Sequence, residues 1–182
     1  MSTRGAIAFG NAKEWSGVYN HADSYPTGLG AGAWEALKSG LLTKEFIESH
    51  PGGWSSFPEI CYCHDSYFSE RDGSSAKDSP FYRKDAPDGR ITNEESDALF
   101  IEYVYVVDTD ANKLHILKNV QVELNSAWLE GWNGEGYFFK HIKEGGETIS
   151  VYQNSAYKHV LAVSLDLDGD EPDWDNLITE EE

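Results

Sequence analysis

A fifteen-residue segment near the amino terminus, residues 18–32, carries most of the side chains that could do chemistry. It places a histidine, a carboxylate, a serine and two tyrosines before a glycine-rich stretch; these residues are His21, Asp23, Ser24, Tyr19, Tyr25, Gly28, Gly30 and Gly32. A histidine beside a carboxylate is the smallest general-base arrangement, because the anion fixes the imidazole tautomer and raises its pKa. His21 and Asp23 point the same way if the backbone between them is extended. We predict that His21 is a general base oriented by Asp23.

The other residues of this segment supply hydrogen-bonding groups for a ligand. Asn20, Ser24 and Tyr25 carry amide and hydroxyl groups, and Gly28 and Gly30 lie where a helix is expected to begin. Free backbone N–H groups at a helix amino terminus bind anions, because the helix dipole favours negative charge there. We predict these five residues as ligand-binding. The alternative is a capped turn in which the glycines only allow a helix to pack closely on a sheet.

Arg4 and Glu102 are the candidates outside this segment. If the first two predicted strands pair, Arg4 lies at the open end of the hairpin beside His21, where a guanidinium binds a carboxylate or phosphate. Glu102 interrupts an apolar face of a predicted strand, and a carboxylate there needs a partner or a raised pKa. We predict Arg4 as an anion ligand and Glu102 as a second catalytic carboxylate. The alternatives are an ion pair between Arg4 and Asp23, and an exposed edge position for Glu102.

Three further patterns stay open as alternatives, and we assign no metal ligands from them. Cys61, Cys63 and His64 offer zinc ligands, but they lack the usual spacing and a fourth member. Oxygen ligands alternate over residues 166–175, as in a calcium loop, but the glycine comes too early and no glutamate follows at the twelfth position. Ser2, exposed by removal of the initiator methionine, would have the position of an N-terminal nucleophile.

Successive hairpins must position these residues. Apolar residues at helical spacing predict a helix over 29–42 and a shorter one over 43–49. Hairpins with helices inserted after the first one predict an α+β fold on an antiparallel sheet, with one or two inserted helices. The predicted strands, from alternating apolar residues, cover residues 4–9, 15–19, 59–63, 99–107, 113–118, 137–142, 148–152 and 159–165.

The sequence divides into one domain and a tail. Residues 1–165 are predicted to form a single α+β domain, within which residues 50–97, rich in proline and glycine, form an irregular insertion or lid. Residues 166–182 hold nine of the 32 acidic residues and no lysine or arginine. They are predicted to form an acidic C-terminal tail.

The formal net charge of −18 excludes some classes of partner. A surface this negative argues against direct binding of nucleic acid and favours a basic protein partner or cations. No apolar run approaches the roughly 20 residues that span a bilayer, and the first residues lack the pattern of a signal peptide. Two cysteines one residue apart make a poor disulfide. We therefore expect a soluble cytoplasmic protein that does not bind membranes.

Three stretches together resemble a family of uncharacterised proteins from bacteria, phages and fungi. They are Ser2-Thr3-Arg4-Gly5, the Tyr19–Gly30 segment YNHADSYPTGLG, and Ile101–Asp108, IEYVYVVD. The family has a TRG start, a YNHxDSYPxGLG box and a later E-[YW]-x-Y-x-[IV]-D strand. The resemblance implies that Arg4, the box and residues 102–108 belong together, and it implies no reaction type.

The sequence therefore favours a pocket formed by Arg4, His21, Asp23 and Glu102 that binds, and in one version hydrolyses, a small anionic or nucleotide-like ligand. Arg4 would bind the anion and His21 would act as base. No motif identifies a cofactor or an oligomeric state. The alternative is a non-enzymatic acidic protein, such as an inhibitor of the phage or mobile-element type, that binds a basic protein surface.

Overall fold

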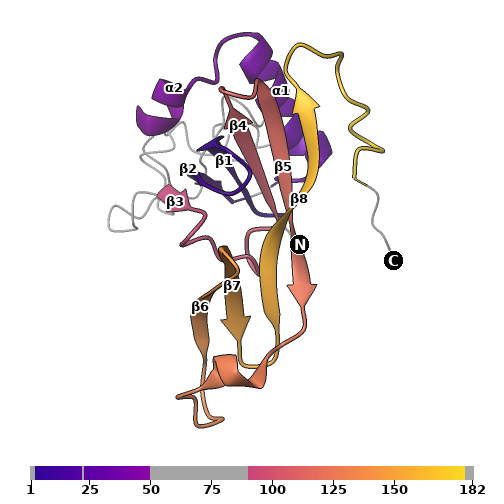
Figure 1. The fold of residues 1–182 in the computed structure, drawn as a ribbon. Coiled ribbons are helices and arrows are strands. Elements are labelled where there is room, and N and C mark those ends of the chain that lie inside the picture. Colours follow the sequence, from indigo (N-terminus) through magenta and orange to yellow (C-terminus); the bar gives the residue numbers. More distant parts are fainter. Residues whose placement is uncertain (1–2, 22, 50–89, 179–182) are drawn as a thin grey trace, which may run out of the picture.

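The computed structural model describes residues 3–21, 23–49 and 90–178, and eight strands of that part form one curled sheet (Figure 1). Their order in the sheet is β3-β2-β1-β4-β5-β8-β7-β6. Together with the helices between β2 and β3, this confirms the predicted α+β class. The strands are β1 (Gly5–Gly10), β2 (Trp15–Asn20), β3 (Arg90–Thr92), β4 (Tyr103–Asp108), β5 (Lys113–Val122), β6 (Phe139–Glu144), β7 (Glu147–Tyr152) and β8 (Ala156–Asp166).

The sheet is mixed, so the prediction of an antiparallel sheet was wrong at one pair of strands. β1 and β4 run parallel, with Gly5 paired to Tyr103 and Phe9 to Val107, while every other neighbouring pair of described strands is antiparallel. A parallel pair needs a long crossover, and the chain between β2 and β4 supplies it. Local hairpin patterns predict contacts within hairpins and carry no information about which hairpins become neighbours.

Two helices and a π-helical turn follow β2. The turn η1 (Pro26–Gly30) leads into α1 (Ala31–Lys38), which is shorter than the helix predicted over 29–42. Gly40 has a φ of +77° just beyond α1, a conformation that ends a helix and suits glycine. The second helix, α2 (Lys44–Ser49), is found where predicted, and the Thr43 hydroxyl accepts a hydrogen bond from the Phe46 amide at 3.1 Å.

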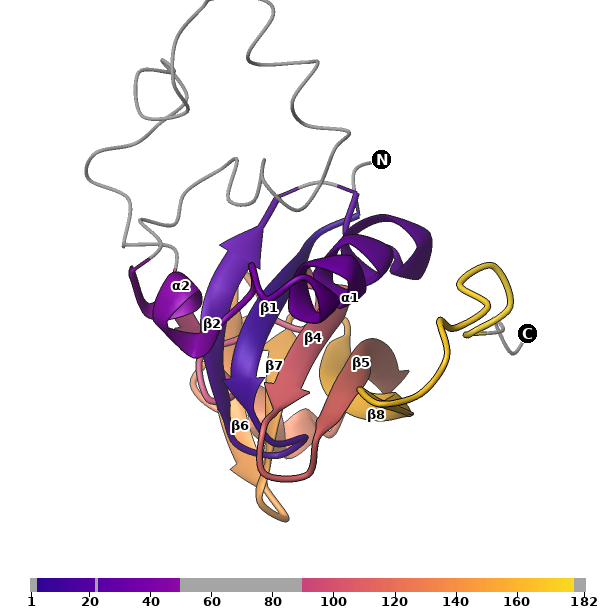
Figure 2. The ribbon, with the colours of Figure 1, turned by 90° about the horizontal axis from the view of Figure 1, so that it is seen from above.

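The two faces of the sheet carry separate core clusters. On the helix face, Ile7, Val18 and Tyr105 are buried against α1 and α2, which lie over β1, β2 and β4 (Figure 2). The other side, here called the second face, carries the alternate residues of the same strands. Its buried cluster consists of Ala6, Ala8, Trp15, Ile101, Val104, Val106 and Leu117.

The predicted strand over 99–107 begins later than expected, at Tyr103. The Asp97 carboxylate accepts from the Leu99 amide at 3.0 Å, and the Asp97 carbonyl accepts from Phe100 and Ile101, so this stretch is a turn. β5 and β8 are longer than predicted, and the β6–β7 hairpin is found as expected. A short 3-10 helix, Ser126–Leu129, was not predicted.

Several predicted features lie outside the described residues. These are Ser2, the strand over 59–63, the cysteines with His64, and all of the predicted insertion up to residue 89. The last part of the predicted insertion, residues 90–97, includes β3. No helix in the described ranges is long and apolar enough to cross a membrane.

Residues 167–178 follow β8 and pack against the helix face. Leu167, Trp174, Leu177 and Ile178 contact the buried cluster there, and the Trp174 ring lies 6.3 Å from the Trp34 ring. Six acidic residues from the last position of β8 onward are exposed; they are Asp166, Asp168, Asp170, Glu171, Asp173 and Asp175. The acidic segment is therefore anchored by apolar side chains while its charges face solvent.

Candidate functional site

The amino-terminal ends of the parallel strands β1 and β4 bring three predicted residues together. Gly5 pairs with Asn20 of β2 and with Tyr103 of β4, so the residues one position outside these pairs lie side by side on the second face. These residues are Arg4, His21 and Glu102. The Glu102 amide donates to the Arg4 carbonyl at 2.8 Å. We call this cluster the Arg4 end.

Arg4 is half-buried and forms no ion pair with the described residues, so the alternative pairing with Asp23 is not found. Its guanidinium carbon lies 5.3 Å from the centroid of the Phe100 ring. Its Nε is buried and has no hydrogen-bond partner in the part of the chain that the structure describes. A buried donor without a partner costs roughly 1–3 kcal/mol. The guanidinium is therefore able to donate to an incoming anion.

His21 is hydrogen-bonded to a tyrosine. The Tyr19 hydroxyl lies 2.8 Å from His21 Nδ1, and the two rings are 5.9 Å apart. Burial raises the pKa of Tyr19 to about 12, although the nearby charge of Arg4 opposes the shift. Asp23 has a φ of +52°, so the extended backbone that would align it with His21 is not present. Tyr19, rather than Asp23, is the side chain seen to orient the imidazole.

Asn20 and Ser24 lie inside the core, where they hold the segment in place. Both are fully buried, and the Asn20 amide nitrogen donates to the Ser24 hydroxyl at 2.8 Å. The Tyr105 hydroxyl donates to the Ser24 carbonyl at 2.7 Å. Tyr25, by contrast, is 39% exposed. The predicted ligand-binding residues therefore divide into a buried supporting pair and an exposed tyrosine.

Close packing accounts for the two glycines of the segment. A Cβ on Gly28 would lie 2.3 Å from the Asp23 carbonyl, and one on Gly30 would lie 2.8 Å from the Tyr105 ring. Their N–H groups donate to the Tyr25 carbonyl at 2.9 and 3.5 Å. This geometry corresponds to the alternative of a turn that packs tightly on the sheet.

At the opposite end of β4, the structure shows a hydrogen-bonded chain that sequence analysis did not select. His115 Nε2 lies 3.2 Å from an Asp108 carboxylate oxygen, and His115 Nδ1 lies 2.8 Å from the Ser164 hydroxyl. The sequence signals were Asp108, the last residue of the IEYVYVVD stretch, and a lone histidine within the apolar run of β5. Ser164 is paired with His115 across β5 and β8, a register that the sequence does not reveal. We call this chain the Asp108 end.

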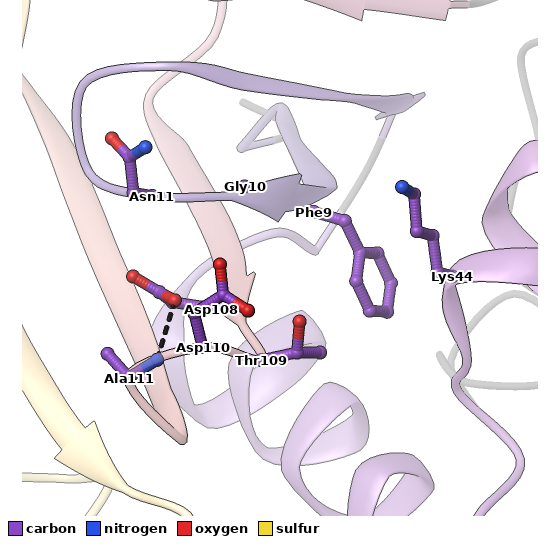
Figure 3. Close-up of a pocket in the computed structure, with 8 residues that line it drawn as sticks. All are labelled: Phe9, Gly10, Asn11, Lys44, Asp108, Thr109, Asp110 and Ala111. Atoms are coloured by element: carbon purple, nitrogen blue, oxygen red, sulfur yellow. Dashed lines mark hydrogen bonds between the residues drawn. The ribbon is translucent and has the colours of Figure 1, made fainter.

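The Asp108 carboxylate is fixed by the turn that follows β4. Its second oxygen accepts from the Ala111 amide at 2.9 Å (Figure 3). This backbone hydrogen bond, helped by His115 and opposed by burial, lowers the pKa of Asp108 below its ordinary value. The carboxylate is therefore charged at neutral pH and rigidly placed.

The cavities on the described surface include a larger and a smaller one. The larger, of about 680 Å³, lies between Phe9 and Lys44 on one side and the turn from Asp108 to Ala111 on the other (Figure 3). The second, of about 420 Å³, lies between the β1–β2 and β6–β7 turns and is lined by Trp15, Leu117, His159 and Leu161 among others. Neither cavity is lined by a residue that was predicted from the sequence as catalytic or ligand-binding.

His159 forms part of the wall of the smaller cavity. Its Nε2 donates to the Ile101 carbonyl at 2.8 Å, and its ring contacts Trp15 edge-on at 6.4 Å. Burial lowers the pKa of His159 to about 4, because the charged imidazolium loses its hydration there. This histidine is neutral at physiological pH.

No three His, Cys, Asp or Glu side chains within the described ranges come together as a metal site. The open calcium alternative at residues 166–175 therefore has no structural counterpart there. Comparison with protein-family models, with curated proteins and with solved structures gave no match to this chain.

Proposed function

We propose that the Arg4 end binds a small anionic ligand such as a phosphate or a nucleotide. The observation that carries the proposal is the half-buried guanidinium of Arg4, which has no carboxylate partner and a buried Nε without a hydrogen bond among the described residues. A positive charge in this position is stabilised by an anion that accepts its hydrogen bonds. Arginine suits phosphate because its planar donors match the phosphate oxygens.

The neighbours of Arg4 favour a ligand with an aromatic part. Phe100 is 45% exposed and lies against the guanidinium, so it offers a ring face next to the charge. Tyr25 is a second exposed ring in the predicted segment. In a hydrolytic version of the proposal, His21 accepts a proton while Glu102 supplies a carboxylate at the same end of the sheet. Asn20 and Ser24 act by positioning the segment.

The test is a thermal-shift titration with inorganic phosphate, AMP and ATP at millimolar concentration. We expect at least one of them to raise the melting temperature of the wild-type protein, and Arg4→Gln to abolish the shift. Lys13→Gln is the matched control, because it removes one positive charge from the exposed β1–β2 turn and leaves the Arg4 end intact. His21→Ala tests the imidazole in the same way. Equal shifts in wild type and Arg4→Gln would refute the proposal.

The acidic segment supports a second candidate, a protein that binds a basic protein surface. Its apolar side chains are anchored on the helix face, whereas its six carboxylates are exposed. An anchored acidic strip presents its charges without the ordering cost that a disordered tail has.

Charge neutralisation tests this candidate better than deletion, because deletion would also remove Trp174 from the core. The six exposed Asp and Glu residues are changed to Asn and Gln, and partners are captured from lysate at low and high salt. A partner that is lost in the neutralised variant and at high salt supports the candidate. Capture that is insensitive to both contradicts it.

A further inference from the structure

The direction of the hydrogen bonds at the Asp108 end points to an activated serine. An ionised carboxylate only accepts, so His115 Nε2 carries the proton that it donates to Asp108 at 3.2 Å. In the neutral imidazole, Nδ1 then has a lone pair, and it faces the Ser164 hydroxyl at 2.8 Å. A hydroxyl donating to a histidine that a carboxylate orients is the signature of a nucleophile with its base.

Burial differs among the three hydrogen-bonded side chains in the way that this chemistry requires. The side chains of Asp108 and His115 are only 12% and 10% exposed, so the base and its orienting group are sheltered from water. Ser164 is exposed. It lies beyond the pairing of β8 with β7. In that part of β8, β5 is the one neighbouring strand in the described sheet (Figure 1). A substrate can therefore reach the hydroxyl from the edge of the sheet.

A cavity of mixed polarity lies farther along β5 and β8, and each of these strands contributes a leucine to its lining. Leu117 lies two residues after His115 on β5, about 7 Å along the strand, and it lines the cavity of about 420 Å³. Leu161 of β8, which pairs with Leu117, lines it too. The register of β5 and β8 shifts between Ile116 and Leu117, and such bulges often re-aim side chains beside active sites.

We propose that Ser164 is the nucleophile of an acyl-transfer site for short apolar acyl esters, separate from the Arg4 end. His115 is the general base, Asp108 orients it, and the cavity lined by Leu117 and Leu161 receives the acyl chain. No residue of the proposed anion site takes part, so the two proposals stand or fall independently.

The reaction proceeds in two balanced steps. Ser164 Oγ bonds to the acyl carbon, its proton moves to His115 Nδ1 and then to the departing alcohol, and the bond between acyl carbon and alcohol oxygen breaks. Water then attacks the acyl-serine, giving its proton to His115. The carboxylic acid leaves, and the proton returns to Ser164.

The experiment uses an alkyl fluorophosphonate on the full chain, with peptide mass spectrometry as readout. In this probe, Ser164 Oγ bonds to phosphorus, fluoride leaves and His115 takes the proton. We expect one adduct on Ser164, none in Ser164→Ala, and unchanged labelling in Ser126→Ala, which removes an exposed serine elsewhere. His115→Gln should slow labelling by on the order of a hundredfold.

Hydrolysis of p-nitrophenyl butyrate by the same variants provides the second measurement. Ser164 is exposed, so its alanine variant is expected to keep the wild-type circular dichroism spectrum, which separates loss of chemistry from loss of fold. If His115→Gln does not fold, Asp108→Asn replaces it as the test variant, and this variant should also slow the labelling of Ser164. A folded wild type without an adduct on Ser164 overturns the proposal. So does a labelling rate that is the same in wild type and in the folded His115 or Asp108 variant.

Discussion

The two ends of the β1–β4 strand pair handle polar groups in opposite ways. At the Asp108 end, carboxylate, imidazole and hydroxyl form one continuous hydrogen-bonded chain, closed at one end by the Ala111 amide. At the Arg4 end, the guanidinium is held against Phe100 and its Nε has no partner among the described residues. The polar groups of the Asp108 end satisfy one another, whereas the Arg4 end has one buried donor, Arg4 Nε, without a partner in the described part of the chain.

This difference in hydrogen bonding predicts a different role for each end. A buried polar group that lacks a partner costs free energy, so an incomplete end is stabilised by something that binds to it. A complete chain needs no ligand, and its interest lies in the reactivity that hydrogen bonding confers on its exposed hydroxyl. Binding is therefore the natural hypothesis for Arg4, and catalysis for Ser164.

The largest expected effect is the response of His159 to acid. His159, bonded to the Ile101 carbonyl near the Arg4 end, has a pKa of about 4 instead of 6.5. Between these pH values the unfolded chain takes up a proton that the folded protein does not, so stability falls as the pH is lowered through this window. The loss is roughly 3 kcal/mol, at about 1.4 kcal/mol per pKa unit.

Urea unfolding at pH 7 and pH 4 measures this loss, with His159→Gln as the control. Glutamine retains a donor for the Ile101 carbonyl but does not titrate. The wild type should therefore lose more stability on acidification than the variant. An equal loss in both proteins would mean that the histidine is hydrated in the folded state.

Asn20→Leu is expected to destabilise the Arg4 end by about 2–3 kcal/mol. Leucine has a similar volume, but it leaves the fully buried Ser24 hydroxyl without the donor 2.8 Å away. Urea unfolding at pH 7 provides the measurement, and the exposed Asn154→Leu is the matched control. A change below about 0.5 kcal/mol, the range of surface substitutions, would show that the pair does not hold the segment.

Tyr105→Phe is a milder change to the same support and should cost about 1–2 kcal/mol. It removes the hydroxyl that donates to the Ser24 carbonyl at 2.7 Å and leaves that carbonyl buried. Tyr157→Phe, at a half-buried position on β8, is the control. If the Arg4 end depends on this support, Tyr105→Phe also weakens any phosphate-induced thermal shift. An unchanged shift would confine the effect to stability.

The smallest expected effect concerns the Asp108 end. The pKa of Asp108 is lowered from 3.8, so its charged form stabilises the fold above that pH, and this contribution is lost as the pH falls below it. Asp108→Asn should therefore flatten the decline in stability between about pH 5 and 3. Asp110→Asn, in the same turn, is the control. A decline as steep in Asp108→Asn as in wild type would contradict the prediction.

Local patterns in the sequence predicted the hairpins and α2 well. Alternation over residues 4–9 and 15–19 was sufficient because both strands and their turn lie within one stretch of chain. The parallel pairing of β1 with β4 depends on a long crossover, which local alternation does not encode. The strand predicted from Leu99 began late because the Asp97 side chain caps a turn there.

Candidate site residues were selected where the sequence placed polar groups densely. The segment around His21 was recognised from its composition, and strand register then explains why Arg4 and Glu102 lie beside it. The Asp108 end was missed because Ser164 and His115 are 49 positions apart. They meet only through the register of β5 and β8, after a bulge that shifts the pairing by one residue.

The parallel pair also affects how the chain folds during synthesis. Tyr103, the partner of Gly5, is made about a hundred residues later, so at 5–20 residues per second β1 waits several seconds for β4. During that time the first hairpin exposes an unpaired strand edge and the apolar side chains of Ile7 and Val18. The nascent amino-terminal hairpin is therefore exposed to aggregation until α1 and β4 dock on it.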